Sequence, residues 1–148
     1  MVGEDKRETN RGRTGVCQLS WRLAYVPVLD TGEFVFLSGQ TGCRPDGTVA
    51  TDPERQFREA FEFLNANLAA AGLTLDDVVE MTTYHVGLRK HLTAFIRAKD
   101  EYIFPPYPAW TAIGVTELIT EGTLVEVRVI ARRRRTGAMP LPWTGNPT

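Results

Sequence analysis

One segment, residues 52–72, constrains the fold most strongly. It reads "DPERQFREAFEFLNANLAAAG", and its apolar residues recur at the three- and four-residue spacing that lines one side of an α-helix. These residues are Phe57, Ala60, Phe61, Leu64, Leu68 and Ala71. Asp52 suits the N-cap, Pro53 the first helical position and Gly72 the residue after the last turn. A helix with one apolar side must pack on another layer, so the segment predicts a layered fold.

That other layer is predicted to be a β-sheet, because four segments are rich in β-branched and aromatic residues. They cover residues 33–42, 76–88, 109–115 and 123–135. A second amphipathic helix is predicted before the third of these segments, with Leu92, Phe95, Ile96, Tyr102 and Ile103 on one face. The predicted order is strand, strand, helix, strand, helix, strand, strand, in which the first strand has no assigned bounds. This order predicts an α+β fold, a sheet with both helices packed on one face.

The opposite face of this sheet has no predicted layer to cover it. Phe34, Phe36, Tyr84 and Trp110 are large residues on predicted strands. Large apolar patches on soluble proteins are usually covered by a partner. We therefore expect a second subunit to cover this face, and the protein to be an oligomer.

The length of 148 residues fits one domain. Residues 1–14 are polar and residues 136–148 are rich in proline, glycine and threonine, so both are predicted to be flexible tails around one domain at 15–135. Hydrophobic residues make up 43% and charged residues 24%, as in an ordinary globular protein. The chain has no apolar run of membrane-spanning length, and its first residues are charged where a signal peptide would be apolar. We expect a cytoplasmic protein with no membrane partner.

Several kinds of chemistry lack a sequence motif. His85 and His91 are not at ligand spacing for a helix, and Cys17 and Cys43 follow no metal or redox pattern, so no metal site is expected. Motifs for a nucleophile elbow, a P-loop and a dinucleotide-binding turn are absent from the sequence. The net charge of −1 argues against nucleic-acid binding. The arginine run at 132–135 is a local exception, which we interpret as the solvated end of a strand.

Glu126 is the candidate for acid–base chemistry. It lies between valines in a segment where Val125, Val127 and Val129 alternate with polar residues, so it should point away from the helices. A carboxylate desolvated there by a neighbouring subunit would have a raised pKa and could serve as general acid or base. The alternative is an ion pair with Arg128, which would contribute little at a surface.

Five segments resemble the RidA family, also called YjgF, of reactive-intermediate imine deaminases. They are "FVFLSGQTG", "RQFREAFEFLNANLAAAGLTLDDVVEMTTYHVGL", "FIRAKDEYI", "PAWTAIGV" and "LVEVRVIA", and the likeness runs from about Tyr25 to Ala131. The resemblance implies a chorismate-mutase-like α+β fold and a homotrimer with three ligand clefts at its subunit interfaces. It also implies hydrolysis of an enamine or imine of a small 2-keto acid to the keto acid and ammonia, without metal or organic cofactor.

The same resemblance implies roles for individual residues. Glu126 falls on the glutamate that positions and activates water. Tyr25 falls on a tyrosine that lines the cleft, and Gly39 lies in the loop whose backbone contacts the ligand.

Three cleft positions depart from the family's pattern. Trp110 stands where the deaminases carry an arginine that grips the substrate carboxylate, Lys99 where an asparagine is usual, and Ala112 where a cysteine or similar residue is usual. An indole has one N–H donor and no charge, so it cannot replace that grip. We interpret Trp110 as a cleft wall for an apolar or aromatic ligand. Alternatively, the substrate is still an acid and Lys99 or Arg128 supplies the displaced cation.

The sequence thus predicts a RidA-like protein that binds a small organic ligand in intersubunit clefts. Hydrolysis of a non-standard imine or enamine is one interpretation. The alternative is a non-catalytic small-molecule-binding or chaperone-like module. Endoribonuclease activity has only the arginine run in its favour.

Overall fold

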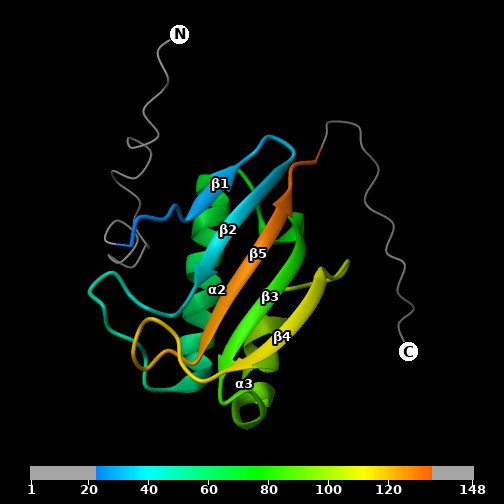
Figure 1. The fold of residues 1–148 in the computed structure, drawn as a ribbon. Coiled ribbons are helices and arrows are strands. Elements are labelled where there is room, and N and C mark those ends of the chain that lie inside the picture. Colours follow the sequence, from blue (N-terminus) through cyan, green and yellow to red (C-terminus); the bar gives the residue numbers. More distant parts are fainter. Residues whose placement is uncertain (1–22, 135–148) are drawn as a thin grey trace.

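Five strands form one sheet in the order β1-β2-β5-β3-β4 (Figure 1). In the computed structural model, which describes residues 23–134, the strands are β1 (Val28–Asp30), β2 (Phe34–Gln40), β3 (Val78–Val86), β4 (Ala109–Val115) and β5 (Val125–Arg132). β3 and β4 are parallel, and every other neighbouring pair is antiparallel. The α+β class with a mixed sheet is confirmed. The predicted tails at 1–14 and 136–148 lie outside the described residues, as does Cys17.

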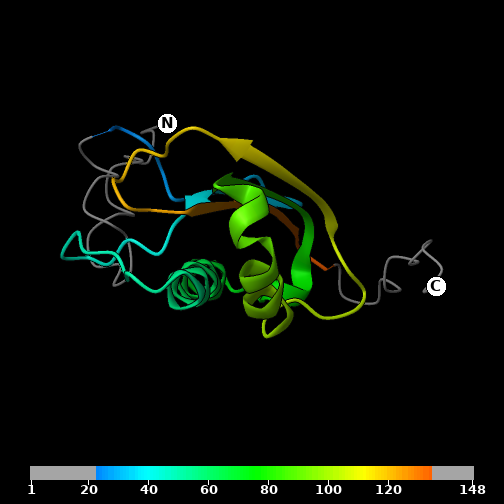
Figure 2. The ribbon, with the colours of Figure 1, turned by 90° about the horizontal axis from the view of Figure 1, so that it is seen from below.

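The two α-helices of the described residues, α2 (Pro53–Ala70) and α3 (Leu88–Asp100), lie on the same side of the sheet, as predicted (Figure 2). A short 3-10 turn, η2 (Leu75–Asp77), precedes β3. The first helix begins and ends as its sequence indicates: the Asp52 side chain accepts a hydrogen bond from the Arg55 N–H at 2.8 Å, and Gly72 has φ +73° just after the helix. A positive φ of this kind favours glycine.

The prediction for the second helix is wrong in two respects. α3 ends at Asp100, so Tyr102 and Ile103 follow it in a turn whose N–H groups bond to the Lys99 carbonyl oxygen. Its buried side is centred on Phe95 and Ala98. Because successive helical residues are about 100° apart around the axis, Ile96 is turned toward solvent and is 37% exposed.

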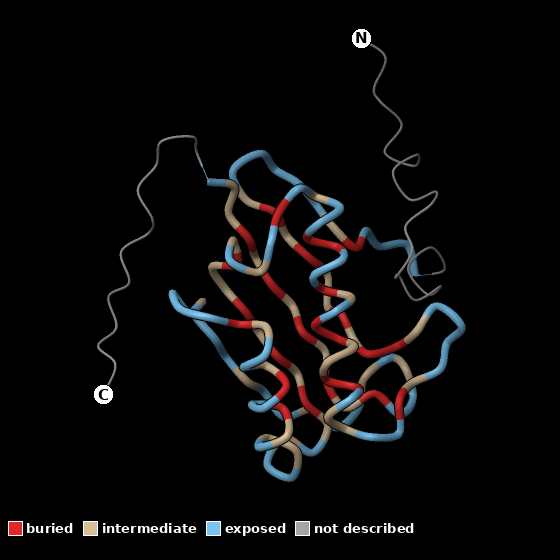
Figure 3. Tube along the Cα trace, turned by 180° about the vertical axis from the view of Figure 1, so that it is seen from behind, coloured by how far each residue is buried: buried red, intermediate tan, exposed pale blue. Residues whose placement is uncertain are grey.

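The core lies between the helices and the sheet, and Figure 3 shows the buried residues running along the strands. The alternation predicted for β5 is confirmed, since Val125, Val127 and Val129 are fully buried and the residues between them are not. We call the other side of the sheet the open face. It carries Phe34, Phe36, Tyr84, Ile113 and Ile130, which are partly or largely exposed. Covering of this face by another subunit stays a prediction.

Trp110 is not part of the open face, contrary to our expectation. In the parallel register of β3 and β4 it is paired with Met81, a residue that is 1% exposed and faces the helices. Paired residues of neighbouring strands point to the same side of a sheet. Trp110 therefore lies on the helix side, beside Phe95 of α3, with the two ring centroids 5.9 Å apart.

Candidate functional site

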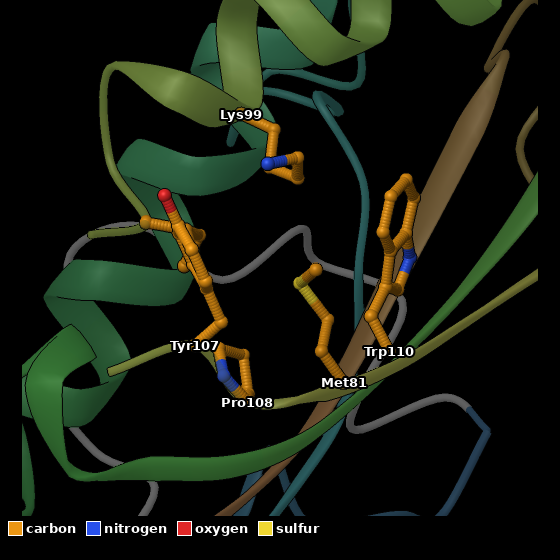
Figure 4. Close-up of a pocket in the computed structure, with 6 residues that line it drawn as sticks. Met81, Lys99, Tyr107, Pro108 and Trp110 are labelled. Atoms are coloured by element: carbon orange, nitrogen blue, oxygen red, sulfur yellow. The ribbon is translucent and has the colours of Figure 1, made fainter. Parts of the chain in front are cut away.

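A pocket of about 240 Å³ opens on the helix side of the sheet, beside the edge strand β4. It is lined by Met81, Lys99, Ile103, Tyr107, Pro108 and Trp110. Figure 4 shows Tyr107 and Trp110 on opposite sides, with Met81 between them and Lys99 above. Cavities of 150 Å³ already admit benzene, so this one has room for a small organic molecule.

Trp110 is held by a hydrogen bond and by ring contacts. Its Nε1–H donates to Thr83 Oγ1 at 2.9 Å, and its ring packs beside Phe95. The side chain is nevertheless 38% exposed, because one part of the ring borders the pocket. An indole has only one N–H, so the part that borders the pocket offers carbon surface.

Lys99 supplies the one cation among the residues that line this pocket. Its side chain is only 11% exposed, and its Nζ lies 5.5 Å from the centroid of the Trp110 ring, within the range of a cation–π contact. The ammonium also pairs with the Asp100 carboxylate at 2.5 Å. The pocket thus has mostly apolar walls and one positively charged side chain at the end nearest α3.

Glu126 lies on the open face, opposite Tyr84 in the register of β3 and β5. It packs against Gly39 of β2: a Cβ atom at residue 39 would lie 2.0 Å from Glu126 Oε1, so glycine leaves the space that the carboxylate occupies. Burial raises the pKa of Glu126. Within residues 23–134 the carboxylate has no ion-pair partner, and Arg128 instead lies 3.7 Å from Glu80. The ion pair of Glu126 with Arg128 is therefore absent.

Tyr25 precedes β1, and hydrogen bonds between the next two residues and Ser38 bring it close to the end of β2 that carries Gly39. Ser38 donates its hydroxyl to the Val26 carbonyl oxygen at 2.8 Å and its N–H to the Pro27 carbonyl oxygen at 2.9 Å. Ser38 directly precedes Gly39, so the segment that carries Tyr25 runs next to the Gly39 end of the strand. The Tyr25 side chain is 36% exposed.

The predicted site residues thus form two groups on opposite faces of the sheet. Trp110, Lys99 and Ala112 lie on the helix side, where Ala112 is paired with Thr83 and is not among the pocket's lining residues. Gly39, Glu126 and Arg128 lie on the open face. Strand alternation makes this separation unavoidable, so one subunit does not bring Glu126 and Trp110 together.

Sequence reasoning missed four of the lining residues, Met81, Ile103, Tyr107 and Pro108, and it missed Thr83 beneath Trp110. A usable signal existed. Strand, helix and strand follow each other over residues 78–115, and such a unit usually pairs its strands in parallel. Assigning that pairing would have placed residues of β3 next to Trp110.

The ion pairs of the arginine run at 132–135 support its interpretation as the solvated end of a strand. Arg132 pairs with Glu33 at 2.9 Å, Arg133 with Asp30 and Arg134 with Asp77 at 3.0 Å. Each described arginine of the run therefore has a carboxylate beside it. The fourth, Arg135, lies outside the described residues.

Two further features are absent from the part of the chain that the structure describes. No cluster of three or more histidine, cysteine or acidic side chains is arranged there to hold a metal ion. None of the described helices has the length and apolar character needed to cross a membrane.

Comparison with known proteins places the chain in a family. The model of the family described as Endoribonuclease L-PSP matches residues 18–133. RutC family protein YjgH of Escherichia coli is 43% identical over 109 residues, which cover 73% of this chain and 82% of that relative. The 2-iminobutanoate/2-iminopropanoate deaminase of Salmonella typhimurium is 33% identical over 115 residues, covering 74% of this chain and 88% of that relative.

Solved structures agree with this assignment. Protein YJGH superimposes with a TM-score of 0.74 at 41% identity, covering 80% of this chain and 90% of the other. E. coli TdcF with bound serine gives a TM-score of 0.68 at 30% identity, covering 74% of this chain and 88% of the other. The match of the family model, the sequence relatives and the shared fold together show that the chain belongs to the RidA (YjgF) family.

Proposed function

We propose that this protein binds a small organic ligand in clefts between the subunits of a homotrimer, and that it hydrolyses an imine or enamine there to a carbonyl compound and ammonia. The environment of Glu126 is the observation that supports the proposal most directly. It is a partly buried carboxylate with a raised pKa and no ion pair within residues 23–134, packed on Gly39 at an uncovered sheet face. Maintaining such a group costs stability, which is typical of functional residues.

In the proposed reaction, the Glu126 carboxylate accepts a proton from water as the water oxygen attacks the C=N carbon. The adduct takes this proton on its nitrogen from the Glu126 carboxyl group, which gives the carbinolamine. As the C–N bond then breaks, the remaining hydroxyl passes its proton through the Glu126 carboxylate to the departing nitrogen, so ammonia leaves, C=O forms and the carboxylate is restored. A raised pKa suits this cycle because the group must both accept and donate a proton near neutral pH.

The two groups of residues on opposite sheet faces support a cleft between subunits. A second copy placed against the open face could bring its Trp110 pocket toward Glu126 of the first copy. The large side chains of the open face are suited to such an interface. The deaminase name of the Salmonella relative supports the choice of reaction class.

Trp110 and Lys99 indicate how the substrate would differ from the family's usual one. The ligand would place an apolar or flat body beside the indole ring and an anionic group near the Lys99 ammonium. Arg128, the other candidate cation, lies beside Glu80 on the open face and does not line the pocket. Because Lys99 lines the same pocket as Trp110, we propose Lys99 for the displaced anion-binding role.

Lys99→Met should weaken binding of benzoate roughly tenfold, the effect of one charge-assisted hydrogen bond. Binding of benzamide, which has the same shape and no charge, should change little. Titration calorimetry measures both, with Lys90→Met as control because Lys90 is exposed on the same helix. If Arg128→Ala weakens benzoate and Lys99→Met does not, the cation is the one on the open face. If neither variant weakens benzoate binding, the hypothesis that the ligand carries an anionic group is wrong.

The proposed activity is tested with freshly generated 2-iminopropanoate, with ammonia release as the readout. We expect wild type to be slow on this substrate and Trp110→Arg to be faster, because an arginine at this position can grip the carboxylate with paired hydrogen bonds. A fast wild-type protein would mean that the substrate is the family's usual one. If both are inert, the protein does not catalyse this reaction.

A second candidate function is a non-catalytic binding module. The observation in its favour is that Trp110, in the arginine's place, already uses its single donor on Thr83. An endoribonuclease has less support, since Arg132, Arg133 and Arg134 each lie beside a carboxylate.

A further inference from the structure

We infer that Thr83 is a positioning residue that fixes Trp110 as a flat, donor-free wall of the pocket and so helps to set which ligands the pocket accepts. Thr83 lies on β3, is fully buried and does not line the pocket itself. It acts through its hydroxyl, which lies 2.9 Å from Trp110 Nε1 and 2.8 Å from His85 Nε2.

The direction of one of these two hydrogen bonds is fixed. The indole N–H can only donate, so Thr83 Oγ1 accepts from Trp110. The other, between Thr83 Oγ1 and His85 Nε2, can run either way, because a hydroxyl oxygen can accept twice and the imidazole tautomer decides which atom donates. Burial lowers the pKa of His85 to about 4, so the imidazole is neutral at pH 7. In either direction Thr83 links Trp110 to His85.

His85, at the other end of this hydrogen-bonded series, is held firmly in place. It is 1% exposed, and its ring packs edge-on against Phe95 with the centroids 4.6 Å apart. Phe95 in turn packs beside the Trp110 ring. The hydrogen bond to Thr83 and the packing against Phe95 thus hold the indole in one orientation.

Packing alone does not explain why residue 83 carries a hydroxyl group. Valine has nearly the same shape, favours strands as strongly and would avoid burying a polar group. Met81 and His85, the neighbours of Thr83 on this face, are also buried, so water is not available to the hydroxyl. The indole N–H and His85 are the partners that make threonine suitable there.

The consequence for the pocket is a specificity rule. With its N–H committed to Thr83, Trp110 gives a ligand carbon surface and no donor, and Lys99 is the remaining charged group of the lining. Ligands that present a flat apolar surface to the indole should be favoured over ligands that need a hydrogen bond from it. The part of this inference that concerns ligand choice rests on the proposed function, whereas the positioning of Trp110 by Thr83 does not.

The Trp110 Nε1–H signal in ¹H–¹⁵N NMR tests the positioning directly and needs no ligand. It is assigned by its loss in Trp110→Phe. We expect slow exchange of this proton with water in wild type and in Thr83→Ser, and about tenfold faster exchange in Thr83→Val. Thr82→Val is the matched control, since Thr82 is the adjacent residue on the opposite face and bonds to Glu80. Unchanged exchange in Thr83→Val overturns the inference.

Benzoate binding then tests the effect on ligand choice. Thr83→Val should lower the affinity about fivefold, because a freed indole samples other orientations, and Thr83→Ser should restore it. If the indole signal responds and benzoate affinity does not, Thr83 positions Trp110 without setting specificity, and that half of the inference is overturned. A wild-type protein that fails to bind benzoate contradicts the proposed ligand class, whereas the exchange result still decides the positioning role.

Discussion

Replacement of Glu126 by glutamine is expected to lower the rate of imine hydrolysis by about two to four orders of magnitude, the usual contribution of a positioned acid–base group. Glutamine keeps the size of the side chain and cannot accept a proton from water. The measurement is ammonia release under single-turnover conditions, on 2-iminopropanoate or on whichever imine wild type or Trp110→Arg hydrolyses. Glu121→Gln serves as control, since Glu121 is exposed in the loop before β5. An unchanged rate would remove Glu126 from the mechanism.

The pH profile adds a second readout for this residue. Burial raises the pKa of Glu126, and a general base must be ionised, so kcat/KM should fall as the pH drops toward this raised pKa. The acid limb should disappear in Glu126→Gln.

The stability of the fold should respond in the opposite direction to activity. A carboxyl group whose pKa is higher in the folded state binds its proton more tightly there, so its ionised form destabilises the fold at neutral pH. Glu126→Gln should therefore raise the melting temperature at pH 7 while it lowers activity. A lower melting temperature would mean that the carboxylate makes a stabilising contact.

The elements that the sequence predicts well are those whose signals are local. The helix at 53–70 has an N-cap, a proline, a continuous apolar stripe and a terminal glycine, all within one segment. The alternation in β5 likewise needs only neighbouring residues, and it put Glu126 on the correct face. Local signals also failed once: Tyr102 and Ile103 continue the apolar spacing of α3, yet the chain turns after Asp100.

The site was harder to predict because it depends on which strands are neighbours. Trp110 was assigned to the open face, and only the parallel register with Met81 places it on the helix side. Tyr107 precedes a strand, and its role in the pocket follows from how the chain turns after α3. The link between Trp110 and Thr83 spans 27 positions in sequence and has no local signal.

Mixed assemblies should recover activity that neither parent variant has, if the cleft joins the Trp110 pocket of one subunit to Glu126 of another. Glu126→Gln lacks the base. Trp110→Ala lacks the wall and should lose roughly one to two orders of magnitude in kcat/KM. When the two are co-expressed in equal amounts, a cleft has one chance in two of an intact pocket and one in two of an intact Glu126. The product is about one quarter of wild-type activity, whatever the number of subunits in a closed ring.

The comparison that decides this is between co-expressed and separately purified variants. Oligomers that assemble before they are mixed should stay at the mean activity of the two parents until subunits exchange, because every cleft then carries one defect. Recovery to about one quarter on co-expression alone requires that the two residues act across a subunit boundary. Activity that stays at the mean of the parents in both samples would show that Trp110 and Glu126 do not share a cleft. In that case their separation on opposite sheet faces would reflect two independent roles, and the pocket beside β4 would be a binding site without the proposed base.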